Sequence, residues 1–105
     1  MDETVNQIEA TILFFAKARE LTGTKECKIY IPRELSSTDL FDRIIRTFKL
    51  ESIRNQIILA LNEEFIAPNS TLVLSEKDEI AVIPPLSGGL SNRLLYKSVI
   101  LHLLY

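Results

Sequence analysis

The chain has 105 residues, which is enough for one compact domain and too few for two. Its net charge is −2, with both signs mixed along the sequence, so the basic stripe of a nucleic-acid-binding domain is not present. The acidic start, MDETVNQIEA, carries no apolar stretch, and a signal or transit peptide is therefore not expected. Cys27 is the single cysteine, which excludes an internal disulfide and favours a reducing compartment such as the cytosol.

The first part of the chain predicts two strands joined by a helical turn. In residues 7–16 one face carries Ile8, Ala10, Ile12 and Phe14, and the other carries Leu13 and Phe15. Because both faces become apolar, this strand is expected in the middle of a sheet. Gly23 ends the helical turn. Residues 25–31 alternate again, with Cys27 expected as a core residue rather than a nucleophile.

A helix is predicted over residues 37–49. Ser36 and Asp39 have the spacing of an N-terminal capping pair. Apolar side chains then recur at helical spacing, at Leu40, Phe41, Ile44, Ile45 and Phe48. Because charged residues occupy the other face, we expect this helix to lie across one face of the sheet.

Short strands make up the rest of the predicted domain. Residues 57–61 are an apolar run typical of a buried strand, 62–64 form a turn, Phe65 and Ile66 resume a brief strand, and 79–83 form the last strand. One long helix packed on a mixed sheet is an α+β roll, and two hairpins around a single helix are the β-grasp (ubiquitin-like) arrangement. We therefore expect one domain over residues 1–89.

The residue types that most catalytic sites need are scarce. The single histidine, His102, makes a Ser-His-Asp or Cys-His site improbable, and the four Cys or His ligands of a zinc site are missing. Three glycines cannot supply a phosphate-binding loop. The adjacent carboxylates at 63–64 and 78–79 are interpreted as solvated turns. We expect a domain with no metal and no stably bound cofactor, and with no catalytic side chains of its own.

The segment 83–89, IPPLSGG, is the unusual part of the sequence. The prolines fix φ and remove two backbone donors, so the sheet must stop there and the chain leaves it extended. The arm runs through Pro84, Pro85, Leu86 and Ser87. It ends in Gly88 and Gly89, which have no side chains. Such an arm spans about 20 Å and suits a narrow active site of a partner. A plain linker is the alternative, since Gly-Gly is common in turns.

Three segments in order resemble one family. FFAKARELTG (14–23), IILALNEEFI (57–66) and DEIAVIPPLSGG (78–89) are similar to the small subunits of molybdopterin synthase, which are ubiquitin-like sulfur carriers. The resemblance implies that a ubiquitin-activating-type enzyme, consuming ATP and magnesium, adenylates the carboxylate of Gly89. A sulfur donor then forms a thiocarboxylate. The large synthase subunit would receive the arm, and sulfur would pass to cyclic pyranopterin monophosphate to build molybdopterin.

The resemblance also implies a docking surface. In the family, the positions of Phe15, Phe65 and Ile83 form an apolar patch at the base of the arm, and Leu86 would join it. An exposed patch of this kind is typical of an interaction site. A heterotetramer of two small and two large subunits is implied in the same way. The alternative is that these side chains only cover the second face of the sheet.

Residues 90–105, LSNRLLYKSVILHLLY, follow the position at which the family's chains end. The segment is too short to span a bilayer and is interrupted by Arg93 and Lys97. A two-faced helix and a disordered segment are both compatible with it. While Leu90 is attached, Gly89 has an amide where adenylation needs a carboxylate. Three explanations of this extension are open. It is removed by a protease, it comes from an alternative transcript or a mis-set gene boundary, or it makes the chain a binding module that delivers no sulfur.

Other functions stay open at this point. A ubiquitin-like modifier attached to lysines would share the fold and the Gly-Gly end, as would a carrier for thiamine or tRNA thiolation. The IPPLSGG tip favours the molybdopterin branch. A non-catalytic interaction domain would tolerate the loss of everything after Ile83.

Overall fold

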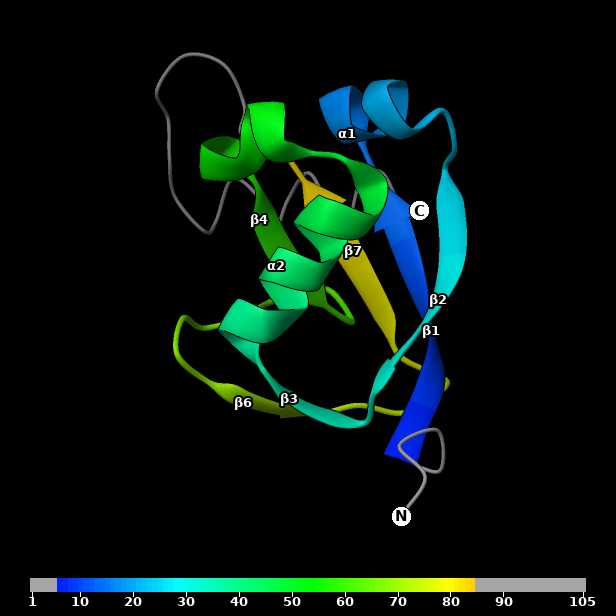
Figure 1. Cartoon of the computed structure of the whole chain (residues 1–105), viewed down its shortest axis with the longest axis vertical. Coiled ribbons are helices and arrows are strands. Elements are labelled where there is room, and N and C mark those ends of the chain that lie inside the picture. Colours follow the sequence, from blue (N-terminus) through cyan, green and yellow to red (C-terminus); the bar gives the residue numbers. More distant parts are fainter. Residues whose placement is uncertain (1–5, 85–105) are drawn as a thin grey trace.

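The computed structural model describes residues 6–84, in which a five-stranded sheet and a two-stranded ribbon are packed with helices (Figure 1). The strands are β1 (Gln7–Phe14), β2 (Glu26–Pro32), β3 (Glu34–Ser36), β4 (Ile58–Leu61), β5 (Glu64–Phe65), β6 (Thr71–Val73) and β7 (Glu79–Ile83). The helices are α1 (Ala16–Thr22), α2 (Ser37–Phe48) and the 3-10 helix η2 (Glu51–Gln56). None of the helices in this part of the chain is long and apolar enough to cross a membrane.

The main sheet has the strand order β2-β1-β7-β4-β5. Strand β1 pairs antiparallel with β2 and parallel with β7, and β4 pairs antiparallel with β7. The sheet is therefore mixed, and β1 lies inside it, as its two apolar faces predict. A parallel pair needs a long crossover, and here the chain between β1 and β7 includes α2. The predicted α+β roll with one main helix is confirmed.

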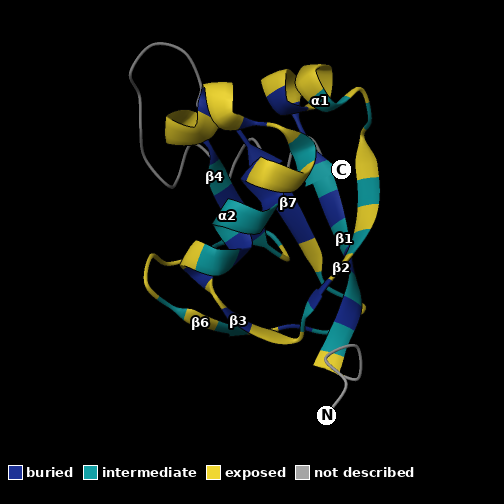
Figure 2. Cartoon of the chain, viewed as in Figure 1, coloured by how far each residue is buried: buried dark blue, intermediate teal, exposed yellow. Residues whose placement is uncertain are grey.

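The inner face of the sheet packs against α2 and holds the larger core. Leu40, Ile44 and Ile45 of the helix are buried there, together with the inward residues of β1 and β7. The rings of Phe14 and Phe48 meet edge to face with centroids 4.7 Å apart. Figure 2 shows the strands beneath α2 buried and the outer side of α2 exposed. The amphipathic pattern of this helix therefore sets which face of the sheet it covers.

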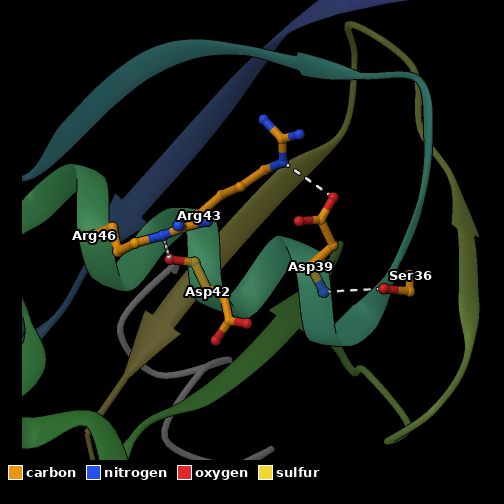
Figure 3. A network of polar contacts seen from close by, with 5 residues as sticks. All are labelled: Ser36, Asp39, Asp42, Arg43 and Arg46. Atoms are coloured by element: carbon orange, nitrogen blue, oxygen red, sulfur yellow. Dashed lines mark hydrogen bonds and ion pairs between the residues drawn. The ribbon is translucent and has the colours of Figure 1, made fainter.

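Local contacts fix both ends of α2, and Figure 3 shows those at its first turns. The backbone N–H of Asp39 donates to Ser36 Oγ at 3.0 Å, so Ser36 is the N-cap. The Asp39 carboxylate pairs with Arg43 one turn along, at 3.1 Å, and does not close the reciprocal half of a capping box. Lys49 adopts a left-handed conformation with φ of 56° and ends the helix, close to the predicted boundary.

The structure adds elements that the sequence pattern did not predict. Strands β3 and β6 form a separate antiparallel ribbon, with Leu35 opposite Leu72, and η2 follows α2. Three-residue strands are too short to show an alternation, so hydrophobic periodicity could not find them. The second brief strand comprises Glu64 and Phe65 rather than Phe65 and Ile66. Gly23 ends α1 with φ of 75°, as expected.

Candidate functional site

Strand β7 carries the chain toward the arm and divides its side chains between the two faces of the sheet. Ile80 and Val82 belong to the inner core, whereas Ala81 and Ile83 belong to a second apolar cluster. In register, Ala81 lies opposite Ala60 and Ile83 opposite Ile58 of β4. The alternation of side chains along a strand therefore gives the last strand an apolar outer face as well.

The second cluster brings together the three residues expected at the docking surface. We call it the outer face, and its members are Leu13, Phe15, Ile58, Ala60, Phe65, Ala81 and Ile83. Phe15 follows β1 directly, and its backbone N–H donates to the carbonyl of Val82 at 3.3 Å. Phe65 reaches the cluster through its pairing with Ala60. Phe15, Phe65 and Ile83 thus come from three separate parts of the chain and share one face.

Exposure on this face differs from the expected open patch. The side chains of Phe15 and Ile83 are only 5% and 2% exposed, while Leu13, Ile58 and Phe65 are partly exposed. The small Ala60 and Ala81 in the middle of the face leave room for larger neighbours to pack over the sheet. Leu13 and Ile58 therefore contribute accessible apolar surface that the family resemblance did not indicate. The sequence could have indicated them, because each stands between two residues that point to the inner core.

The first residue of the arm after β7, Pro84, is also the last residue that the structure describes. Pro84 directly follows β7 and is buried. The remaining arm residues, Pro85, Leu86, Ser87, Gly88 and Gly89, lie outside the described residues, as does the segment 90–105. Because Pro84 lacks a backbone donor, it cannot continue the ladder with β4, and the strand stops at Ile83. The arm therefore starts at a buried residue that directly follows Ile83 of the outer face.

A polar network joins the end of β4 to the start of β7. Asn62 and Glu63, with φ of 50° and 72°, form the tight turn after β4. The Asn62 amide donates to Asp78 Oδ1 at 2.8 Å, and Asn62 Oδ1 accepts from the backbone N–H of Glu79 at 2.9 Å. The second Asp78 oxygen accepts from the N–H of Ser75. Asp78 thus has a structural role beyond that of a solvated turn residue.

The same contacts change the acidity of Asp78. The hydrogen bond from Asn62 holds the pKa of Asp78 below its usual value, and the bonds from Ser75 act in the same direction. Partial burial opposes this effect. An acid that is kept ionised by neutral donors is suited to bracing two turns, and not to donating a proton to a substrate.

Charge on the outer face is mostly negative. Strand pairing places Glu79 beside Thr11, Tyr30 beside Glu9, and Glu26 beside Leu13. Every second residue along a strand shares a face, so the three glutamates lie on the outer side of the sheet. Glu26 and Glu79 flank the apolar cluster, and Glu9 lies four residues along β1 from Leu13. Lys28, opposite Thr11, is the only basic residue that the strand pairings of the main sheet place on this face. The face therefore combines an apolar centre with an acidic margin.

A separate groove between α2, η2 and β4 has a volume of about 360 Å³. Its lining is mainly apolar, and its one arginine, Arg54, pairs with Asp42 at 2.6 Å. The same guanidinium lies 5.2 Å from the centre of the Phe41 ring. Since the cation is already engaged twice, this groove offers little for binding an anion. No cluster of three metal-ligating side chains occurs within residues 6–84.

Known proteins are similar to this chain in sequence. The ThiS family model matches residues 12–89. The molybdopterin synthase sulfur carrier subunit of Drosophila erecta is 46% identical over 83 residues, covering 78% of this chain and 92% of that protein. The human protein of the same name is 42% identical, with coverages of 77% and 94%.

Solved structures agree on the fold. SAMP1 from Haloferax volcanii superposes with a TM-score of 0.61 at 21% identity, over 77% of this chain and 99% of that one. A putative molybdopterin converting factor subunit 1 from Pyrococcus furiosus gives 0.59, also at 21% identity, with coverages of 75% and 99%. On sequence and fold together, the chain belongs to the ThiS family and, within it, to the molybdopterin synthase sulfur carrier subunits.

Proposed function

We propose that this protein carries sulfur for the synthesis of molybdopterin. The observation that carries the proposal is 46% identity to a molybdopterin synthase sulfur carrier subunit along a match that covers most of the domain. The family model extends to residue 89 and so includes the whole arm. A scarcity of catalytic residue types agrees with a carrier whose partner provides the acids and bases. The cytosol is the proposed location.

The chemistry would take place at the end of the arm. The carboxylate of Gly89 attacks the α-phosphorus of ATP on an adenylating enzyme, which releases pyrophosphate and leaves an acyl-adenylate. A sulfur donor then displaces AMP, so Gly89 ends in a thiocarboxylate. With no side chains at positions 88 and 89, the terminal carbonyl can enter a narrow tunnel without a clash. The large subunit would then use two such sulfurs to convert cyclic pyranopterin monophosphate to the dithiolene of molybdopterin.

The outer face would position the arm in the large subunit. Phe65, Leu13 and Ile58 provide its accessible apolar surface, and Phe15 and Ile83 fix its shape from beneath. A cluster that lies beside the root of the arm can dock and orient the arm at the same time. The acidic margin formed by Glu9, Glu26 and Glu79 favours a basic rim on the partner. We extend this role to the adenylating enzyme, because it must also hold the arm.

The extension after Gly89 decides whether the chain can carry sulfur. An amide bond to Leu90 leaves no carboxylate to adenylate. Activity therefore requires that residues 90–105 be removed, or else the full-length form is an inactive product. Intact-mass spectrometry of the protein from its own cells distinguishes the two cases. A mass that ends at Gly89 supports processing, and a solely full-length mass refutes it.

Reconstitution tests the proposed function directly. Chains 1–89 and 1–105 would each be mixed with the adenylating enzyme, ATP, magnesium, a sulfur donor, the large subunit and cyclic pyranopterin monophosphate. We expect molybdopterin from 1–89 alone, with a thiocarboxylate on Gly89 detectable by mass as the exchange of oxygen for sulfur. Chain 1–88 is the matched control, because it keeps every described element and lacks only the reacting residue. Failure of 1–89 to form molybdopterin would refute the proposal.

A protein modifier is the second candidate, because it would use the same fold and the same terminal glycine. It predicts isopeptide conjugates of high mass that require Gly89 and form without the large subunit. A carrier for thiamine or tRNA thiolation predicts sulfur transfer without that subunit as well. A pure interaction module predicts that a chain ending at Ile83 keeps all biological activity. The relatives named above favour the molybdopterin branch over all three.

A further inference from the structure

The outer face is apolar, and no described helix is packed on it. All its members except Phe15 lie in strands, whereas the inner face is covered by α2. Leu13 of β1 and Ile58 of β4 stay partly exposed on this face, on either side of β7. Phe15, Ala60, Ala81 and Ile83 are buried, so the accessible part of the face is made by Leu13, Ile58 and Phe65. Partly exposed apolar side chains that gather on one face are typical of a site that another segment or protein covers.

The chain itself supplies a segment of matching character close to this face. Strand β7 delivers the chain at Pro84, directly after Ile83 of the outer face. Leu90 is six residues further on, within about 20 Å even if the arm is fully extended. In residues 90–105, ten of the sixteen residues are apolar, so the segment can provide the apolar partner that the face lacks among the described helices.

The charges of residues 90–105 and of the outer face are opposite in sign. Residues 90–105 include Arg93 and Lys97 and no aspartate or glutamate. Strand pairing places Glu9, Glu26 and Glu79 on the outer side of the sheet, against one basic residue there, Lys28. Opposite charges around an apolar centre favour one orientation of the contact. Complementarity in both polarity and charge is what a specific contact needs.

We propose that residues 90–105 bind back onto the outer face and occupy it in the full-length chain. The extension would then act twice: its amide blocks Gly89, and its apolar side chains compete with the large subunit for the docking surface. This second effect rests on the proposed function, whereas the contact itself does not. Tethering makes the contact effective even when it is weak. At an effective concentration of roughly 1 mM, a contact with a Kd of about 0.1 mM would weaken partner binding about tenfold.

Paramagnetic broadening in the full-length chain tests the contact. Ser98→Cys would carry a nitroxide label in a Cys27→Ser background, since Ser98 is a polar position within the extension. We expect the methyl signals of Leu13 and Ile58 on the outer face to broaden strongly, and those of Leu40, on the buried side of α2, to keep most of their intensity. Equal broadening on both faces, or none on the outer face, would overturn the proposal.

Two substitutions make the result specific. Ile100→Asp places a charge among apolar residues of the extension and should abolish the broadening, whereas Ser91→Asp adds the same charge at a polar position and should leave it. Neither position lies in the described domain, so neither change disturbs its core. Mixing labelled chains with unlabelled, isotope-enriched chains detects a contact between two copies. Broadening that appears in this mixture would contradict an intramolecular contact.

Binding to the large subunit separates this inference from the proposed function. Chain 1–89 should bind about tenfold more tightly than 1–105, and Ile100→Asp in the full chain should recover most of the difference. Equal affinities of 1–89, 1–105 and the variant would overturn the competition. If 1–89 does not bind at all, the proposed function fails, while the broadening experiment still decides the contact.

Discussion

The partly exposed Phe65 is the most informative position to change, because it lies on the outer face and carries little of the inner core. Phe65→Ala should weaken the affinity of chain 1–89 for the large subunit by about 2 kcal/mol, or roughly thirtyfold. The magnitude is that of truncating an aromatic side chain that becomes buried in an interface, about 2 kcal/mol. Isothermal titration calorimetry or surface plasmon resonance measures this loss.

Phe41→Ala is the matched control for this prediction. Phe41 is also a partly exposed phenylalanine, but it lies on α2, on the helix side of the sheet, beneath the Arg54 guanidinium. Its removal should leave the affinity for the large subunit within about twofold while costing a similar amount of stability. If Phe65→Ala binds as tightly as the unchanged chain, or if both variants lose affinity equally, the outer face is not the docking surface.

The remaining predictions concern stability and are measured by urea unfolding. Asp78→Ala should lower the free energy of unfolding by about 1 kcal/mol at pH 7. Since the hydrogen bond from Asn62 lowers the pKa of Asp78 in the folded state, this contribution is present above the unfolded pKa and is lost as the pH falls through the folded pKa. The difference between variant and unchanged chain should therefore close below about pH 4, and a constant difference would contradict the assignment. Ser36→Ala should cost about 1 kcal/mol, because the N–H of Asp39 loses its acceptor; an unchanged midpoint would refute the cap. Gly23→Ala should cost about 1 kcal/mol from its φ of 75° alone, since nothing lies within 4 Å of an added Cβ, and a cost several times larger would point to a clash.

The principal elements follow from local patterns in the sequence. The apolar residues on both faces of residues 7–15 predict β1 as an inner strand. The helical spacing of apolar residues from Leu40 to Ile45 predicts α2 and its buried face. Ser36 and Gly23 mark helix ends through their own side-chain or backbone chemistry. These features involve residues close in sequence, so one sequence is enough to find them. The ribbon of β3 and β6 was missed, because its pairing joins residues far apart along the chain.

The sequence by itself predicts a stiff arm after Ile83 and fixes the amide bond at Gly89, because proline geometry, glycine freedom and the bond to Leu90 are properties of the covalent chain. Only the tertiary structure decided what lies at the root of that arm. Strand pairing places Ile58 beside Ile83, and Phe65 and Phe15 join the same cluster. Phe15, which was expected to be open, is buried in that cluster. Such exposure depends on neighbours from distant strands, which no local pattern reports.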